Sequence, residues 1–334
     1  MGLPYNNETA DRLKGDLTFK HSNSWRYAQR VWVKESGTWQ KVDNIYVKSG
    51  GTWRDAARYD IYRFELTLNE ANNGSNAASI SYKILANSNS SEPDYTTNGT
   101  ANLNAQTFKL STRLEQVSAW NNNIAYGAIY VTTTQRYLRI DALPAGSRVV
   151  LYVNSNKRIL GKGGNGGNGS QTSNAGGNGQ AGQTALYCRT DTILVNNGQI
   201  AGGGGGGGGG RGAQCTYVNT GQEPCMKGQQ CPATFQNFSQ EQGGGGGGGA
   251  GYPGGQGGPG SPGGQNGQSN AGGNGGGNQT CGAQSGRNGG GLGANGQAQG
   301  QTTGSPGNAG AAIDGVNYIT KETEGTINGP QNNG

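Results

Sequence analysis

Two uninterrupted glycine runs, Gly202–Gly210 and Gly243–Gly249, limit what this chain can fold into. Glycine loses more backbone entropy on ordering than any other residue, so such runs usually form flexible linkers. The alternative is an ordered rod, because an extended helix with three residues per turn has no internal hydrogen bonds. Packed side by side, such helices satisfy one another's backbone groups, and only glycine lets their axes approach closely on all sides. At ~3.1 Å per residue, Gly202–Gly210 would make a rod roughly 28 Å long.

Repetition favours rods over a linker. The 68 glycines fall mostly after residue 160, in glycine-rich segments separated by polar or mixed ones. A strict Gly-X-Y period appears only in residues 254–265 and the chain has 10 Pro, so we do not expect a collagen triple helix. We predict a bundle of polyglycine II helices, with scaffold positions that include Gly202, Gly206, Gly210, Gly243 and Gly249.

Charge and motif content exclude several classes of function. The net charge of +6 is scattered over the first half, and the glycine-rich half has no basic stripe, so no nucleic-acid partner is expected. The N-terminus lacks an apolar signal segment and no window approaches ~20 apolar residues, which predicts synthesis in the cytosol without membrane insertion. Phosphate-binding glycine loops need a following helix and Lys-Ser/Thr, and both are missing. With a single His and no recognisable carboxylate pair, we expect no catalytic residues, no cofactor and no enzyme activity.

The cysteines do not form a metal-binding pattern. Their number is odd, no Cys-x-x-Cys pair occurs, and the only histidine, His21, is distant, so no metal site is expected. Cys215, Cys225 and Cys231 share one segment, where either one disulfide or free thiols are compatible with the sequence.

Residues 1–59 contain a threefold repeat with a spacing of 14 residues. Each copy has an apolar-x-apolar-Lys run, a short polar turn and then Ser/Thr-Trp, which predicts three β-hairpins sharing a core. Its aromatic residues are either a private core or the contact surface of a pseudo-threefold adapter that faces the three chains of a trimeric fibre. The candidate attachment residues are Trp25, Trp39, Trp53, Trp32 and Tyr46.

Residues 60–160 read as a small β module. Strand-like runs are separated by Asn/Gly/Ser-rich turns, which favours a small antiparallel sandwich or sheet. The predicted strands are 61–68, 79–85, 107–110, 128–132, 137–140 and 148–153.

The glycine-rich half, residues 161–334, is interrupted by inserts that we expect at the two ends of the bundle. These are Ser170–Asn174, Thr184–Val195, Arg211–Gln242 and Asn278–Arg287. Aromatic side chains on a rigid frame are typical recognition anchors, although they could instead plug the end of the bundle. The candidate receptor-binding residues are Arg211, Tyr217, Met226, Lys227, Phe235, Phe238 and Tyr252.

Several motifs carry a family resemblance. They are the Trp repeats (25–28, 33–39 and 47–53), the entries into glycine segments (159–169 and 194–202) and the C-terminal segments 312–319 and 325–329. Together they resemble the distal tail-fibre adhesins of T-even-like bacteriophages, which contain a polyglycine sandwich domain. The resemblance implies a monomeric adhesin on the virion that caps a trimeric long tail fibre. Its tip loops would contact an outer-membrane protein of a Gram-negative host, alone or together with lipopolysaccharide.

The expected fold is mainly β and irregular, in three regions. Residues 1–59 form the fibre-attachment domain, residues 60–160 the β module, and residues 161–334 a polyglycine-helix bundle with variable receptor-binding loops. The resemblance finds no motif in residues 60–150, and the cysteine-bearing insert Arg211–Gln242 is particular to this chain. The expected function is a non-enzymatic adhesin at the fibre tip. The alternative, a structural or ice-binding glycine-rich protein, requires a flat regular face and leaves the Trp repeat unexplained.

Overall fold

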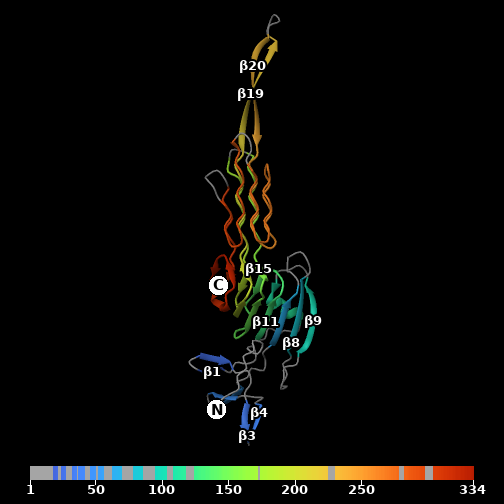
Figure 1. Cartoon of the computed structure of the whole chain (residues 1–334), viewed down its shortest axis with the longest axis vertical. Helices are drawn as coiled ribbons and strands as arrows, with labels where there is room; N and C mark the ends of the chain where they lie inside the picture. The colour runs from blue at the N-terminus through green and yellow to red at the C-terminus, as the bar shows by residue number, and fades with distance from the viewer. Residues whose placement is uncertain are drawn as a thin grey trace.

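The computed structural model shows an elongated molecule, with small hairpins at one end, β-sheets and then glycine segments in the middle, and a long hairpin at the other end (Figure 1). It describes residues 18–21, 24–27, 32–35, 37–41, 46–49, 52–55, 62–69, 78–85, 95–103, 108–117, 124–171, 174–224, 230–277, 282–297 and 304–334.

The Trp repeats form three separate two-stranded antiparallel sheets, which confirms the predicted hairpins. Their strands are β1 Thr18–His21, β2 Ser24–Tyr27, β3 Trp32–Glu35, β4 Thr38–Lys41, β5 Tyr46–Ser49 and β6 Thr52–Asp55. All three have the same register, since Lys is paired with Trp in each: Lys20 with Trp25, Lys34 with Trp39, and Lys48 with Trp53. A threefold arrangement of the hairpins, and their attachment role, stay predictions.

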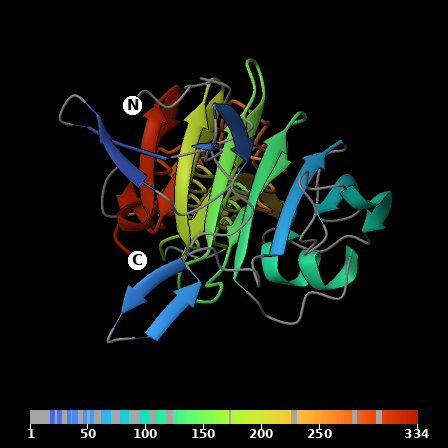
Figure 2. The ribbon, with the colours of Figure 1, turned by 90° about the horizontal axis from the view of Figure 1, so that it is seen from below.

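Three further sheets share one core. The seven-stranded base sheet has the order β22-β17-β14-β11-β7-β8-β9, the five-stranded long side sheet β10-β13-β16-β21-β24, and the four-stranded short side sheet β12-β15-β18-β23. Seen from the end with the small hairpins, the base sheet lies in front of the glycine segments (Figure 2). The strands are β7 Tyr62–Leu68, β8 Ala78–Leu85, β9 Tyr95–Leu103, β10 Phe108–Lys109, β11 Ala125–Val131, β12 Gln135–Arg136, β13 Leu138–Ile140, β14 Arg148–Val153, β15 Arg158–Leu160, β16 Leu186–Cys188, β17 Asp191–Asn196, β18 Gln199–Ala201, β21 Ile313–Asp314, β22 Ile319–Thr323, β23 Thr326–Asn328 and β24 Gln331–Asn332.

The chain winds through these sheets as a three-sided solenoid. Each turn gives one strand to the base, the short side and the long side sheet in that order: β11-β12-β13, β14-β15-β16, β17-β18-β21 and β22-β23-β24. Successive turns pair in parallel, as β11 does with β14 and β14 with β17. The expected antiparallel sandwich is therefore wrong, and only β7–β8 and β8–β9 are antiparallel in these three sheets as described. Period-two alternation indicates one buried face, which a solenoid provides as well as a sandwich does.

Rows of apolar side chains from successive turns fill the solenoid. Leu66, Ile129, Leu151 and Leu194 are register partners along the base sheet, and none is exposed. The long side sheet contributes a second such row, and the short side sheet adds Ile159 and Ile200. The row of the long side sheet consists of Phe108, Leu138, Leu186 and Ile313. Helix α1, Leu110–Val117, adds its buried Leu110 and Leu114 to this core next to β10.

Both glycine-rich excursions leave the solenoid at the same corner, between the short and long side sheets. Residues 161–185 lie between β15 and β16, and residues 202–312 between β18 and β21. In the first and last turns of the solenoid the chain passes this corner within a few residues, through Tyr137 (φ 40°) and Gly329 (φ 116°) respectively. The sheets thus continue across residue 160, and Thr184–Val195, expected as an insert at the end of the bundle, belongs to β16 and β17.

Arg189 holds the returning chain after the second excursion. Its Nη2 donates to Asp314 Oδ1 at 2.9 Å, and its Nη1 donates to the carbonyl oxygens of Cys188 at 2.7 Å and Asp314 at 3.1 Å. The guanidinium also lies 4.0 Å from the centroid of the Tyr187 ring. Charge-assisted bonds of this kind are about twice as strong as neutral ones, so they fix β21 beside β16.

Gly127 is required by a side chain on the neighbouring strand. It is the register partner of Phe64, and a Cβ built on Gly127 would lie 2.4 Å from the Phe64 ring. We predict that Gly127→Ala lowers the free energy of unfolding by about 1–3 kcal/mol, because the ring must leave its position. Denaturant unfolding of the single and double variants measures the effect. With Phe64→Leu in the same chain, part of the loss should be recovered, giving a coupling energy above ~0.5 kcal/mol. Additive effects of the two changes would contradict the steric explanation.

Candidate functional site

The run Gly202–Gly210 lies in the middle of other glycine-rich segments and bonds to them through its backbone. Gly203, Gly206 and Gly209 donate their N–H groups to the carbonyl oxygens of Gln183, Gln180 and Gly177 at 2.8–2.9 Å. The carbonyl oxygens of Gly204, Gly207 and Gly210 accept from the N–H groups of Gly164, Gly167 and Ser170 at 2.8–2.9 Å. The partners change with a period of three. The run is surrounded by segments 161–170, 175–183, 243–250, 284–291, 294–297 and 304–311.

The second run, Gly243–Gly249, is surrounded in the same way. Gly246, Gly247 and Gly248 donate to the carbonyl oxygens of Gly167, Arg287 and Gln265, and accept from the N–H groups of Gly258, Gly207 and Gly273. Its neighbours are segments 161–170, 202–210, 253–260, 262–268, 272–277 and 284–291. We call the two runs together with all the segments that surround them the glycine bundle. An uninterrupted run marks a segment that has neighbours on every side.

Asn side chains in the outer segments of the bundle bond to the backbone of an adjacent segment. Asn165 Oδ1 accepts from the N–H of Gln256 at 2.9 Å, and Asn178 Oδ1 accepts from Ser305 at 2.8 Å. Asn266, Asn288 and Asn295 accept from other outer segments in the same way. The third slot in the Gly-Gly-Asn pattern therefore has a structural use: it satisfies backbone donors at the edge of the bundle.

The chain reverses direction at both ends of the bundle, and the connections at the two ends differ in length. At the near end, beside the sheets, the reversals are tight, around residues 251–253, 269–270 and 292–293. Tyr252 lies here, where its N–H donates to the carbonyl of Gly161 at 3.0 Å. The five far-end connections are longer. They comprise residues 171–174, 211–242, 260–263, 278–283 and 298–303. Variable chain length is thus concentrated at the far end.

A long hairpin projects from the far end (Figure 1). Strands β19 Ala213–Pro224 and β20 Gln230–Glu241 pair antiparallel without a register shift. Its base is held on both sides, since the Arg211 carbonyl accepts from Gln284 N at 2.8 Å and Gly243 N donates to Ser170 O at 2.8 Å. Gln242 Nε2 also donates to the carbonyl of Gly169 at 3.2 Å. The bundle therefore fixes the direction in which the hairpin points.

The structure brings together some of the predicted receptor-binding residues. Arg211 lies at the base of the hairpin and is partly buried. The hairpin strands contain Tyr217, paired with Asn237; Phe235, paired with Asn219; and Phe238, paired with Thr216. Met226 and Lys227 lie outside the described residues. Tyr252 is not brought to this group, because it lies at the near end of the bundle. For the attachment residues, the structure describes hairpin register but not side chains.

The hairpin register bears on the cysteines. Cys215 is paired with Ser239 and Cys231 with Glu223, so the two cysteines are separated by about 27 Å along the ribbon. A disulfide needs Cα atoms within about 7 Å, which excludes a bond between this pair. Cys225 and Cys281 lie outside the described residues. Cys188 is a buried free thiol, and its burial raises its pKa, which keeps it protonated and inert.

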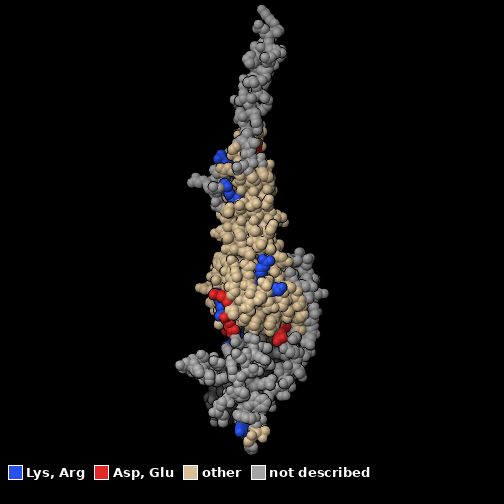
Figure 3. All heavy atoms as spheres, in the orientation of Figure 1, with Lys and Arg blue, Asp and Glu red and all other residues tan. Residues whose placement is uncertain are grey.

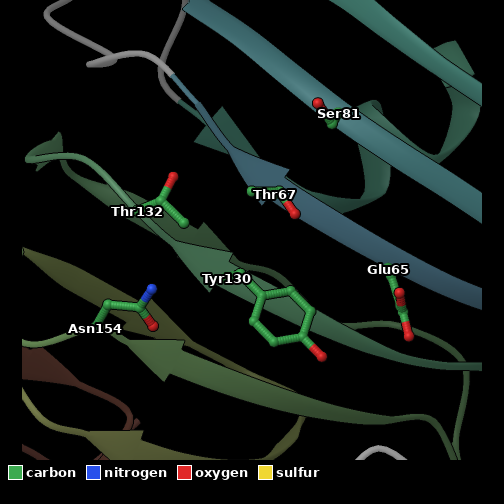
Figure 4. Close-up of a pocket in the computed structure, with 6 residues that line it drawn as sticks. All are labelled: Glu65, Thr67, Ser81, Tyr130, Thr132 and Asn154. Atoms are coloured by element: carbon green, nitrogen blue, oxygen red, sulfur yellow. The ribbon is translucent and has the colours of Figure 1, made fainter.

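A shallow depression of about 360 Å³ lies on the outer face of the base sheet (Figure 4). It is lined by Glu65, Thr67, Ser81, Tyr130, Thr132 and Asn154. The Tyr130 ring stacks on Tyr152 with centroids 4.9 Å apart. Sequence reasoning missed this cluster, although the outward positions of the predicted strands were the available signal. Figure 2 shows the base sheet between the small hairpins and the glycine segments, so the outer face that carries this depression is turned away from the bundle.

The bundle offers little charge to a ligand. Most of its visible surface carries neither Lys/Arg nor Asp/Glu (Figure 3). Within the described part of the chain, no three His, Cys, Asp or Glu side chains are grouped as metal ligands. The same described residues include no helix long and apolar enough to cross a membrane.

Comparison with known families identifies the chain. The family model described as phage tail fibre adhesin Gp38 matches residues 65–332. The chain belongs to the phage tail fibre adhesin family. It is thus a non-enzymatic binding protein at the tip of a virion tail fibre, which confirms the resemblance seen in the sequence. Comparison with curated proteins and with solved structures found no match.

The adhesin's central glycines leave no room for a side chain. A Cβ on Gly206 would lie 1.9 Å from the carbonyl oxygen of Asn165, whereas a Cβ on Gly291 would have no atom within 4 Å. We predict that Gly206→Ala lowers the free energy of unfolding by about 3 kcal/mol or more, since the hydrogen-bonded backbone has nowhere to move. The matched control Gly291→Ala should stay within ~0.5 kcal/mol of the parent. Calorimetry of both variants decides, and equal melting temperatures would show that the run is not closely packed.

Proposed function

We propose that this adhesin caps a trimeric tail fibre as a monomer and binds an outer-membrane protein of a Gram-negative host through the far end of its glycine bundle. The observation that carries the proposal is the difference between the two ends. Short turns lie beside the sheets, whereas the longest connections, including the β19–β20 hairpin, lie at the end farthest from the Trp repeats. Lipopolysaccharide is a second ligand that the same end could contact.

In this proposal the glycine segments are polyglycine II helices stacked as a sandwich. The period of three in their hydrogen bonds supports it, because this helix has three residues per turn and no internal bonds. Fixing the base of each far-end loop lowers the entropy lost when the loop binds its receptor. The bundle thus contributes to recognition by holding the loops, with Gly202, Gly206, Gly210, Gly243 and Gly249 as scaffold positions.

Residues 1–59 form the attachment domain in this proposal. Three hairpins with one register would present equivalent Trp residues to the three chains of the fibre. The outer face of the base sheet, which carries the Tyr130 depression, is turned toward these hairpins. The receptor-binding loops belong to residues 161–334 and lie at the far end of the glycine bundle, beyond the sheets that begin in residues 60–160.

Removing the hairpin tests the receptor-binding part of the proposal. Ala213 and Glu241 are register partners, so residues 214–240 can be replaced by Asn-Gly, a two-residue turn that closes an antiparallel pair. We expect adsorption to host cells to fall at least tenfold, because the longest far-end loop is lost. Fibre capture and melting temperature should be unchanged, which controls for misfolding. Unchanged adsorption would exclude the hairpin from the binding site. Strains that lack single outer-membrane proteins or have truncated lipopolysaccharide then identify the receptor.

Replacing one tryptophan tests attachment. We predict that Trp39→Ala weakens capture of the purified trimeric fibre at least tenfold, since a buried interface Trp typically contributes 2 kcal/mol or more. Thr38→Ala, at an exposed position of the same hairpin, is the matched control and should bind normally. Pull-down measures fibre capture and calorimetry measures the melting temperature, so together they separate an attachment role from a role in the hairpin core. Normal capture combined with a lower melting temperature would instead support a private aromatic core.

A further inference from the structure

The β19–β20 hairpin is a ribbon with two open edges. It forms its own two-stranded sheet, and no other described strand pairs with it. Each strand has 12 residues and spans about 40 Å. An isolated two-stranded ribbon is marginally stable in water, and its unpaired N–H and C=O groups are a template for another strand.

The prolines show which backbone groups face outward. In an antiparallel pair, hydrogen-bonded and non-bonded residue pairs alternate, and proline has no N–H to give to a bonded pair. Pro232 is paired with Gln222 and Pro224 with Gln230. These two pairs are two positions apart, so a single alternation places both prolines at non-bonded pairs. Their ring nitrogens therefore face the outer edges, β20's for Pro232 and β19's for Pro224.

The same alternation shows which other residues direct their N–H groups to an outer edge. Every second residue from the prolines toward the base of the hairpin has its N–H directed to an outer edge. On β19 these residues are Gln222, Thr220, Val218, Thr216 and Gln214; on β20 they are Thr234, Gln236, Phe238 and Gln240. The intervening residues, such as Tyr217 and Asn237, use their N–H groups within the ribbon. Between the base and its proline, the β19 edge thus offers five outward N–H groups and the β20 edge offers four.

These edges lack the charged residues that usually prevent pairing. Proteins protect exposed edges with Lys, other charges, proline or bulges. Here the strands contain only Glu223 and Glu241 as charged residues, at the two ends of the ribbon, and the register has no shift. The stretches between them include several Thr, Val, Tyr and Phe residues, which favour strand pairing.

We propose that the receptor binds by β-augmentation, in which an extended segment of the host outer-membrane protein adds a third strand to one edge of this hairpin. Main-chain bonds to the outward N–H groups of that edge would supply affinity, and alternate side chains would supply specificity. The prolines limit the paired stretch on the base side to residues 214–222 of β19 or residues 234–240 of β20. This inference rests on the proposed receptor-binding role of the hairpin, and it specifies how that hairpin binds.

Paired substitutions separate main-chain from side-chain recognition. Gln236→Ala keeps the outward N–H of β20 and removes the side chain, whereas Gln236→Pro removes both. Val218→Ala and Val218→Pro do the same for β19. We expect proline on one edge to reduce adsorption at least tenfold below alanine at the same position, with little difference on the other edge. Equal effects of alanine and proline on both edges would overturn the proposal in favour of side-chain contacts.

Hydrogen exchange gives a test that needs no variant. The unmodified adhesin is mixed with outer-membrane vesicles from a susceptible strain, and with vesicles from a resistant strain as control. The outward amides of one edge should gain protection only with susceptible vesicles. Absence of that gain, or the same gain at high protein concentration without vesicles, would overturn the proposal, the latter indicating pairing between two adhesins. For the proline variants of the adsorption experiment, slow amide exchange at Tyr217 and Asn237 checks that the ribbon still forms.

The two proposals fail in different ways. If the Asn-Gly replacement of residues 214–240 still adsorbs normally, the hairpin has no receptor role and the proposed function is wrong. If that replacement abolishes adsorption while the outward amides gain no protection, the hairpin binds its receptor by another mode, and only the β-augmentation proposal is wrong.

Discussion

Buried backbone that lacks side chains must have all its polar groups satisfied by neighbouring backbone, and the glycine bundle depends on this requirement. In the run Gly202–Gly210 nearly every described N–H and C=O is bonded to a surrounding segment. A Cβ on any of these glycines would lie less than 3 Å from a neighbouring carbonyl. The hydrogen bonds that satisfy the backbone also set the spacing of the segments, so the frame is held without an apolar core. Its connections can change in length and composition without disturbing any side-chain packing.

The solenoid determines where this frame begins. Gly161 N donates to Ala201 O at 2.9 Å and Gly202 N donates to Asn328 O at 3.0 Å, directly after strands β15 and β18. The register of the short side sheet therefore continues into the bundle without a break. On the returning side, Ala185 N donates to Ala311 O at 3.0 Å, just before β16 and β21. Since parallel strands lie about 4.8 Å apart, the sheets deliver the glycine segments already at a distance suited to backbone bonding.

The sequence predicts the parts of this molecule that have local signals. The three Trp hairpins and strands such as 148–153 follow from alternation and turn residues, and the buried position of Gly206 follows from the length of its run. The parallel winding was not predictable, because its pairings join β14 to β17 across the first excursion and β17 to β22 across the second. Tyr252 was grouped with the tip residues because it interrupts a glycine segment. Which end such a residue occupies depends on how many reversals precede it, and a single sequence does not specify that number.

The near end of the bundle explains why the long connections lie at the far end. Reversals there are confined by the solenoid, as when Gly293 (φ 65°) donates to Gly202 O at 2.8 Å. A longer near-end loop would collide with the sheets, whereas the far end faces solvent. The frame itself is nearly uncharged and regular, so it adds little affinity for any particular surface. In the proposed function, discrimination between hosts therefore comes from the far-end connections, of which the hairpin between Arg211 and Gln242 is the longest.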